Sequence, residues 1–385
     1  MTSPEPLRGN ISDPGAGFGS YAPDDVGWLL TDLSGVELEA PTEEREEAIQ
    51  SGGAHYAESL PQEFQPDPDY LALYRRALDG SALRLARAVA TVTELVLAER
   101  GHDVTLVSLA RAGTPVGILL RRWASYAHGL DLPHYAVSIV RGRGIDTVAL
   151  DHLAAHHDPA RVVFVDGWTG KGAISRELTA ALDAYAAAAG ARFDPDLAVL
   201  ADPGRCARTF GTRDDWLVAS ACLNSTVSGL VSRTVLNPAL LRPGEYHGAK
   251  FYRELADADV SADFLDTVTA AFGHVGAVTP PTDRTVDPHR TAEVARVGAR
   301  YGVDDVNLVK PGVGETTRVL LRRVPWRVLV RAGAPAEDIA HVVLLAQRRG
   351  VPVEEVPGLP YNCVGLIHPR FTRGATGADG LAVAG

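Results

Sequence analysis

The chain has 385 residues, 46% of them hydrophobic, a formal net charge of −11 and a mean hydropathy of −0.01. These values predict a globular protein with room for two domains, and no apolar run approaches the roughly 18 residues that span a bilayer. Cys206, Cys222 and Cys363 are too widely spaced for a disulfide framework or a zinc pattern. Because the N-terminus also lacks a basic and apolar leader, we expect a cytoplasmic protein that does not contact a membrane.

Predicted strands and helices alternate along most of the chain. In chain order they are helix 79–100, strand 104–107, helix 114–126, strand 135–140, helix 146–156, strand 162–165, helix 174–189, strands 197–200 and 216–218, and helix 290–301. Before them, residues 25–75 mix apolar runs with acids and prolines and predict an irregular cap. The alternation is typical of an α/β fold in which helices cover both faces of a parallel sheet, and ligands bind such sheets at the carboxyl ends of the strands.

Composition divides the chain into regions. We expect a disordered N-terminus (1–19), a main domain (20–275), a linker with one helix (276–304), a smaller α/β domain (305–370) and a disordered tail (371–385). Residues 306–370 carry nine Lys/Arg and five Asp/Glu, whereas residues 1–305 have a net charge of −15. Only the smaller domain is therefore expected to meet a polyanion.

Lysine is almost absent from the chain. Of its 37 basic residues only Lys171, Lys250 and Lys310 are lysines, and each lies in a motif-like stretch. A GC-rich genome explains the bias by itself. The alternative is that each lysine marks a site that needs a compact ammonium group, since Arg and Lys differ in shape and hydration.

The most informative stretch is V-V-F-V-D-G-W-T-G-K-G-A at 162–173. A buried strand runs into Asp166, the loop Thr169–Gly172 follows, and a helix begins after it. Backbone N–H groups at such a helix start bind phosphate, and the carboxylate suits a sugar hydroxyl or a metal ion. A P-loop is excluded because Val165 stands where its first glycine is required. An ordinary strand-to-helix turn is the alternative.

Two further loops follow strands of the predicted sheet. Ser108–Gly117 contains Arg111 and a helix start, which suits pyrophosphate; a capped helix start without a ligand is the alternative. Arg141 and Arg143 stand among glycines and predict a mobile cationic loop that closes over an anion. The alternative for this loop is a solvated hairpin.

Strand, acid, short Gly/Thr loop and helix resemble the 5-phosphoribosyl-1-pyrophosphate (PRPP) motif of type I phosphoribosyltransferases, although Gly167 replaces the second acid of that family. The resemblance implies PRPP and Mg²⁺ as ligands and transfer of ribose 5-phosphate to an unknown acceptor. It implies catalytic roles for Asp166 on the ribose hydroxyls, Arg111 on pyrophosphate, and Arg141 and Arg143 as a lid. The PRPP-binding residues would be Ser108, Ala112, Gly113, Thr114, Asp166, Thr169, Gly170, Lys171 and Gly172.

A polar stretch from 205 to 233 offers a second set of candidates. The acceptor is expected near Asp202, Arg208, Arg213 and Asn224. A cysteine hydrolase would instead use Cys222 as nucleophile and His247 as base. Because no group that stabilises a thiolate is evident around Cys222, a buried structural cysteine is the favoured interpretation.

Four stretches together carry a more specific resemblance: V-S-L-A-R-A-G-T-P, H-Y-A-V-S-I-V-R-G-R-G-I-D, F-V-D-G-W-T-G-K-G and S-A-C-L-N-S-T-V-S-G-L-V-S-R-T. They look like a bacterial phosphoribosyltransferase family of tellurium-resistance stress operons, some members of which carry the label cysteine protease StiP. The likeness covers 19–273 and implies a role in a stress response.

The C-terminal region resembles the Pelota and kink-turn-binding ribosomal protein fold, in which G-x-N-E-x-T-K at a helix start grips RNA. Gly314 replaces the Asn of that motif. The RNA-binding residues so implied are Lys310, Gly312, Glu315, Thr317, Arg318 and Arg322. A small module for dimerisation or for covering the active site is the alternative.

The sequence thus predicts a phosphoribosyltransferase joined to a Pelota-like module, with PRPP, an unknown acceptor and RNA as partners. Its rivals are the cysteine hydrolase of Cys222 and His247 and a non-catalytic regulator that binds PRPP or RNA. A homodimer is compatible with the sequence.

Overall fold

The computed structural model describes residues 10–11, 17–40, 57–61, 63 and 65–367. Its main sheet has the strand order β1-β2-β6-β5-β8-β9-β10, and the five strands from β2 to β9 run parallel. The bounds are β1 Asn10–Ile11, β2 Gly27–Asp32, β5 Thr105–Ala110, β6 His134–Val140, β8 Val162–Trp168, β9 Leu197–Ala201 and β10 Phe210–Thr212. Two short strands also belong to this sheet: β7 Gly144–Ile145 pairs with β6, and β11 Gly248–Ala249 pairs with β2.

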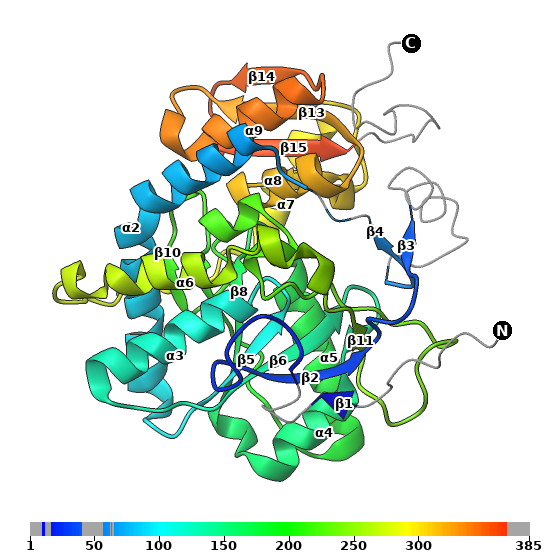
Figure 1. The fold of residues 1–385 in the computed structure, drawn as a ribbon. Coiled ribbons are helices and arrows are strands. Elements are labelled where there is room, and N and C mark those ends of the chain that lie inside the picture. The colour runs from blue at the N-terminus through cyan, green and yellow to red at the C-terminus, as the bar shows by residue number, and fades with distance from the viewer. Residues whose placement is uncertain (1–9, 12–16, 41–56, 62, 64, 368–385) are drawn as a thin grey trace.

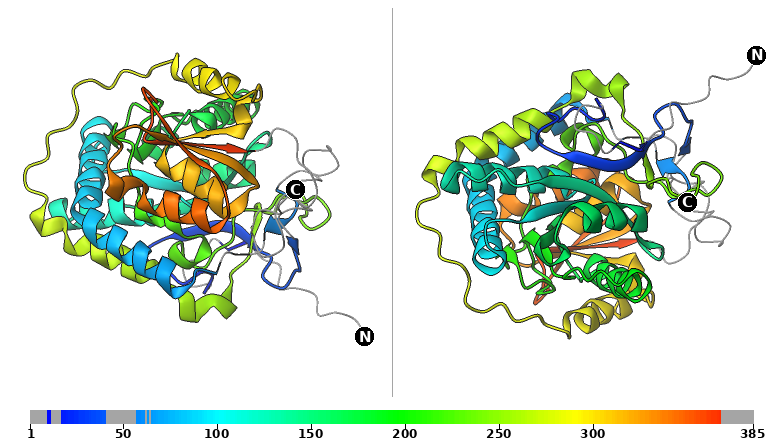
Figure 2. Two further views of the ribbon diagram at one scale, coloured as in Figure 1. Left: turned by 90° about the horizontal axis from the view of Figure 1, so that it is seen from above. Right: turned by 90° about the horizontal axis from the view of Figure 1, so that it is seen from below.

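Helices cover both faces of this sheet, which confirms the predicted fold class (Figures 1 and 2). On one face Leu106, Val163 and Leu200 pack with helices α2 Pro68–Arg100, α3 Thr114–His128 and α6 Ser261–Ala270. On the other face Val107, Phe164 and Val199 pack with α4 Thr147–His156 and α5 Ala173–Ala189. Successive residues of one strand thus enter opposite cores, as expected for a strand buried on both faces.

Three parts of the main domain differ from the sequence-based expectation. The region 25–75 was expected to be irregular, but it holds β2 and the start of α2. Helix α2 begins eleven residues earlier than predicted, because Asp67 accepts a hydrogen bond from the Tyr70 N–H and Pro68 occupies the first turn. The expected strand 216–218 is buried but pairs with no strand in the described part of the chain; β10 is instead the strand beside β9.

The C-terminal module contains a four-stranded sheet of order β12-β15-β13-β14. Its elements are α7 Arg290–Ala299, β12 Val309–Pro311, α8 Val313–Arg322, β13 Pro325–Arg331, α9 Ala336–Arg348, β14 Val353–Val356 and β15 Cys363–Ile367. Helix α7 packs with one face of the sheet. On the other face, Val313, Leu320 and Val342 belong to the same apolar core as α2 and α3, so that the hydrophobic core runs without a break from one module into the other.

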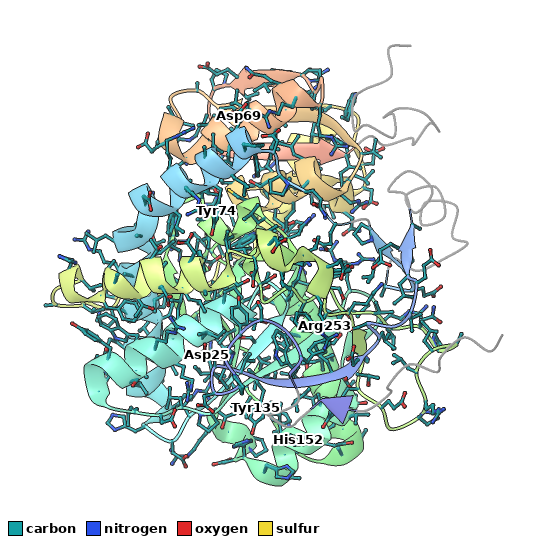
Figure 3. The ribbon with its side chains drawn as sticks, viewed as in Figure 1. Asp25, Asp69, Tyr74, Tyr135, His152 and Arg253 are labelled. Atoms are coloured by element: carbon teal, nitrogen blue, oxygen red, sulfur yellow. The ribbon has the colours of Figure 1, made fainter. Side chains whose placement is uncertain are left out.

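The C-terminal module sits over one end of the main sheet, beside the N-terminal end of α2 (Figure 1). Asp69 lies at that end of α2, in the part that reaches the module (Figure 3), and Arg348 of α9 forms ion pairs with Asp67 and Asp69. The shared core and these ion pairs pack the two modules against each other. The domain boundaries expected from composition stay a prediction.

The predicted tail 371–385 and most of 1–19 lie outside the described residues, but Asn10 and Ile11 pair with β2 and Phe18 is buried. Among the helices that the structure describes, none combines the length and apolar character needed to cross a membrane.

Candidate functional site

Asp166 and the loop Thr169–Gly172 lie where the sheet meets the C-terminal module, a contact we call the seam. The Asp166 carboxylate accepts a hydrogen bond from the Gly167 N–H (2.8 Å). Burial raises the pKa of Asp166 to about 6 against the opposing effect of Arg318, and Glu315 adds to the rise.

The loop predicted to hold a 5-phosphate is occupied by protein. The Lys171 ammonium donates hydrogen bonds to the carbonyls of Val306 and Val309 (2.8 Å for Val309), and the Gly170 carbonyl accepts one from the Tyr361 hydroxyl (2.9 Å). The Gly172 N–H donates to Thr169 Oγ1 (3.1 Å). The C-terminal module therefore fills the position that the sequence assigned to phosphate, and the loop is not an open cradle.

The loop predicted to hold pyrophosphate also turns inward. Arg111 pairs with Glu63 (3.0 Å) and donates to the Val231 carbonyl (3.0 Å), and both members of this ion pair are buried. Ser108 Oγ lies 3.0 Å from the Gly113 carbonyl and 2.8 Å from His134 Nε2. Beside them, Ala112, Gly113 and Thr114 form the turn into α3. The structural alternative, a helix start without a ligand, describes this loop better than a pyrophosphate site.

Arg141 and Arg143 stand on a tight hairpin between β6 and β7. Glu177 of α5 accepts hydrogen bonds from the N–H groups of Gly142 (2.8 Å) and Gly144 (3.0 Å), which fixes the turn. Arg143 points to Glu58 (3.8 Å), and Arg141 acts on the charges at the seam. The hairpin is fixed by Glu177 of α5 and does not form the open lid that the sequence predicted.

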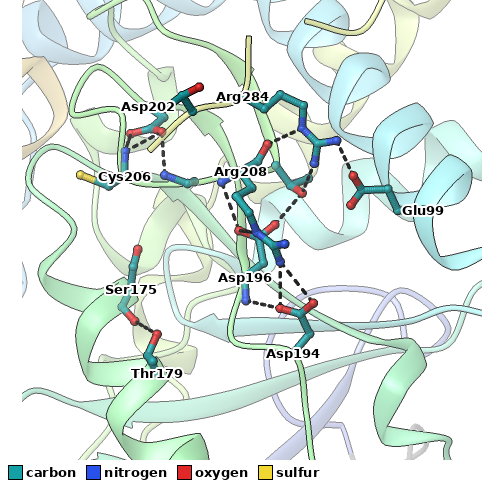
Figure 4. Close-up of polar contacts among 12 residues, drawn as sticks. Glu99, Ser175, Thr179, Asp194, Asp196, Asp202, Cys206, Arg208 and Arg284 are labelled. Atoms are coloured by element: carbon teal, nitrogen blue, oxygen red, sulfur yellow. Dashed lines mark hydrogen bonds and ion pairs between the residues drawn. The ribbon is translucent and has the colours of Figure 1, made fainter. Parts of the chain in front are cut away.

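The four predicted acceptor residues do not form one site. Asp202, at the end of β9, accepts hydrogen bonds from the N–H groups of Cys206 and Ala207 and pairs with Arg213. Arg208 instead pairs with Asp194 and Asp196, before the start of β9 (Figure 4). Asn224 is buried between two short helical turns. Only Asp202 and Arg213 are brought together.

Cys222 and His247 are not in hydrogen-bond contact. Cys222 is 0% exposed, its carbonyl accepts a hydrogen bond from the Tyr70 hydroxyl (2.9 Å), and burial raises the pKa of its thiol to about 12. His247 Nδ1 contacts Ser138 Oγ (2.8 Å), and the His247 N–H donates to Asp146 (2.6 Å). The expectation that Cys222 is structural stays a prediction.

Cys206 is the cysteine with partial exposure, and it lies at the seam. Its thiol donates to the Gly204 carbonyl (3.2 Å), and a Cβ placed on Gly172 would lie 3.1 Å from its sulfur, so the thiol faces the N-terminus of α5. Burial, followed by the charge of Asp202, raises the pKa of the Cys206 thiol to about 12, while Arg176 and Arg213 oppose the rise. Sequence reasoning missed this residue, because nothing local marks it.

Of the residues predicted to grip RNA, Arg318 and Gly312 lie against Trp168 and Asp215 of the main domain. Lys310 and Thr317 are buried, and Thr317 Oγ1 contacts His341 Nε2 (2.7 Å). The guanidinium of Arg318 stacks 4.3 Å above the Trp168 ring, and Glu315 is 4.0 Å from Arg318. Gly312 precedes α8 with a φ of 89°. The side chain of Arg322 lies outside the described residues.

Asp215 of the main domain holds the start of α8. The Val313 N–H donates to Asp215 Oδ1 (2.8 Å) and the Asn362 N–H donates to Asp215 Oδ2 (2.7 Å). Burial raises the pKa of Asp215 to about 6 against these hydrogen bonds. Its carboxylate thus takes the place of an N-cap that Gly312 cannot supply.

Among the described residues no group of three or more His, Cys, Asp or Glu side chains is arranged to hold a metal ion. Mg²⁺ was expected only as a companion of PRPP and stays a prediction that nothing tests.

Comparison with known proteins overturns the predicted activity. Residues 19–269 match the model of the family "Tellurite-like stress resistance cysteine protease StiP", and residues 289–369 match the "PELOTA RNA binding domain". A "Cysteine protease StiP" of Acinetobacter baylyi is 35% identical over 366 residues, which cover 91% of this chain and 94% of the relative. Both names point to a cysteine protease, so the expectation of a phosphoribosyltransferase is wrong, and the alternative of a cysteine hydrolase fits better. The chain belongs to the StiP family and ends in a Pelota-type domain.

Proposed function

We propose that this protein hydrolyses peptide bonds through the thiol of Cys206 and acts in resistance to stress. We choose Cys206 as the nucleophile because it lies at the carboxyl end of the parallel sheet, beside the N-terminus of α5. The class of reaction is supported by the names of the matching family and of the relative from Acinetobacter baylyi.

Access favours Cys206 over the two other cysteines. Cys222 and Cys363 are both 0% exposed, and Cys363 lies within β15 of the C-terminal sheet. A thiol nucleophile must reach a substrate carbonyl, and it must be stabilised as a thiolate by positive charge or a helix N-terminus. Around Cys206 both kinds of group are present, since Arg176 and Arg213 oppose the burial and the Asp202 charge that raise the pKa of its thiol, and α5 begins beside it.

The chemistry follows that of thiol hydrolases in general. The sulfur adds to the carbonyl carbon of a peptide bond, the C–N bond breaks, and the thiol proton passes to the leaving amine. Water then cleaves the thioester, which restores the thiol and releases a carboxylic acid. The amides at the start of α5 would stabilise the oxyanion that forms on the carbonyl.

The closed structure is the inactive form of this site. The thiol is protonated and bonded to the Gly204 carbonyl, and Asp202 disfavours its ionisation. We further propose that the C-terminal module binds RNA, on the strength of its match to the Pelota domain and of the excess of positive charge in 305–370.

The test compares the wild-type chain with Cys206→Ser, Cys222→Ser and Cys363→Ser. Cleavage of fluorescein-labelled casein under reducing conditions is measured for each, alone and combined with Asp215→Ala, which weakens the seam. We expect cleavage to be lost with Cys206→Ser and to persist with the two other substitutions. Cleavage that survives Cys206→Ser, or its absence from every chain that retains Cys206, would overturn the proposal.

A further inference from the structure

Histidine side chains gather where helix α4 ends. His152 and His156 lie four residues apart in the last turns of α4, and His157 follows the helix directly. Residues four apart lie on the same face of a helix. The rings of His152 and His156 accordingly stack, with centroids 4.3 Å apart and planes inclined by 26°. Figure 3 shows His152 at the end of the molecule opposite the C-terminal module.

The His152–His156 pair offers free ring nitrogens. His156 Nδ1 lies 2.7 Å from the His152 carbonyl oxygen, and a carbonyl only accepts, so Nδ1 carries the proton. This bond leaves His156 Nε2 with its lone pair, and a carbonyl is a usual partner for the second nitrogen of a metal-binding histidine. Neither ring nitrogen of His152 has a hydrogen-bond partner within the part of the chain that the structure describes. Each ring can therefore donate one nitrogen to the same ion.

His157 fixes the surroundings of this pair. Its Nδ1 lies 3.1 Å from Thr105 Oγ1 and its Nε2 lies 3.1 Å from the Tyr135 hydroxyl, so both of its nitrogens are engaged. Tyr135 in turn meets the His152 ring edge to face, with centroids 5.8 Å apart, and Tyr246 does the same at 6.5 Å. Two tyrosine rings thus restrict the orientation of His152, as pre-organisation of a ligand requires.

The charges around the pair suit a cation. Burial, followed by the charges of His156 and His157, lowers the pKa of His152, and the neutral ring is the form that binds metal. The pair lies at the carboxyl end of α4, where the helix dipole favours positive charge. Asp103 adds a negative charge that acts on His157.

We propose that His152 and His156 chelate one divalent late transition ion, of the kind represented by Ni²⁺ and Zn²⁺, through one nitrogen of each ring. Imidazole suits such ions, whereas Mg²⁺ and Ca²⁺ prefer oxygen ligands. Metal–nitrogen distances of about 2.0–2.1 Å place two ligating nitrogens roughly 3.4 Å apart in a tetrahedral site. Rings stacked at 4.3 Å reach this spacing by small rotations of their side chains.

The proposed site has two protein ligands and is separate from the thiol site. Since no group of three or more His, Cys, Asp or Glu side chains is arranged to hold a metal among the described residues, water completes the coordination. Thr105 and Tyr135 stand at the starts of β5 and β6, so the pair lies at the amino end of the sheet, opposite Cys206. Metal binding here is independent of the proposed cleavage.

The experiment titrates the full chain, produced without a histidine tag, with Ni²⁺ by isothermal calorimetry. His152→Ala and His156→Ala each remove one ligand. The matched control is His128→Ala. His128 is also the last residue of a helix and lies beside a second histidine, His102, with centroids 6.3 Å apart, but its Nε2 is held by Glu94 at 2.8 Å.

We expect the wild type and His128→Ala to bind Ni²⁺ equally, one ion per chain. His152→Ala and His156→Ala should bind at least about thirtyfold more weakly, since loss of even an outer partner of a ligand costs about 10–100-fold. Ni²⁺ at about a hundred times its Kd should raise the melting temperature of the wild type by roughly 4 °C. EDTA should reverse this shift, and Mg²⁺ should not produce it.

Equal Ni²⁺ affinity of His156→Ala and the wild type would overturn the proposal, as would loss of binding in His128→Ala or the absence of binding by the wild type. His156 is exposed, so its replacement leaves the packing of α4 intact and decides the matter even where His152→Ala unfolds. Calorimetry and melting report metal binding whether or not the protein cleaves casein, so a failure of the proposed protease activity is recognised separately.

Discussion

Replacing Asp166 with Asn should stabilise the protein at neutral pH. Among the described residues the Asp166 carboxylate has one hydrogen-bond donor, the Gly167 N–H, and burial raises its pKa to about 6 from an ordinary value of 3.8. A folded-state pKa above the unfolded value means that the neutral acid is favoured in the fold. Stability from this group is therefore fully present below about pH 4 and is lost as pH rises through about 6.

The magnitude follows from the size of the pKa shift. A difference of about 2 pKa units corresponds to about 3 kcal/mol, at 1.36 kcal/mol per unit. Asn is neutral at every pH and can keep the bond to Gly167 through its Oδ1. We therefore expect Asp166→Asn to raise the free energy of unfolding by up to about 3 kcal/mol at pH 7.5, or the melting temperature by roughly 4 °C for a chain of this length.

The assay is thermal and urea unfolding of both proteins at pH 7.5 and pH 4.5. Asp183→Asn on the exposed face of α5 serves as the control and should change neither midpoint. The reasoning fails if Asp166→Asn destabilises the protein at pH 7.5, or if its gain is as large at pH 4.5 as at pH 7.5.

Three further predictions concern contacts of single residues. Tyr361→Phe should lower the free energy of unfolding by about 1 kcal/mol, measured in urea, because the buried Gly170 carbonyl loses its donor. Burial lowers the pKa of His341 to about 3, so as the pH falls below 6.5 the unfolded chain takes up a proton on this imidazole and the folded chain does not. The free energy of unfolding should therefore fall by up to about 1.4 kcal/mol per pH unit. In His341→Leu the dependence of this free energy on pH should be weaker by that amount. Asp146→Ala should cost about 1–3 kcal/mol, because it removes both the cap of α4 and the acceptor of the His247 N–H; an unchanged urea midpoint would contradict this.

The sequence predicted the parts of the fold that depend on local pattern. Strands such as Val162–Val165 are continuous apolar runs, and this pattern is typical of strands buried on both faces. Helix α2 was predicted only from residue 79 onward, because the apolar periodicity is clear there. Its first eleven residues were missed, since the start of the helix contacts the C-terminal module through ion pairs of Arg348 with Asp67 and Asp69 that no local pattern reports. Strand β2 was missed because acids and prolines surround its short apolar run.

The candidate site was harder to predict because it depends on contacts between residues far apart in the chain. Lys171 follows a glycine loop, which is the local pattern of a phosphate site, but its ammonium binds carbonyls some 135 residues later. The choice between these two partners depends on where the C-terminal module docks, and that is not encoded near Lys171. Cys206 was overlooked for the same reason, since its environment is built by loops after two different strands and by the module above them.

Because the seam covers Cys206, the rate at which its thiol is alkylated depends on how often the seam opens. With a thiol pKa of about 12, the thiolate fraction at pH 7.5 is about 3 × 10⁻⁵, against about 10⁻¹ for an exposed cysteine with a pKa of 8.5. The closed form thus supplies far less of the reactive thiolate at this pH, even before access is considered. If the seam opens for about 1% of the time, which corresponds to about 2.7 kcal/mol, nearly all alkylation takes place from the open form. The measured rate then reports the open population, and any ligand that binds only the open form must raise it in proportion to its binding energy.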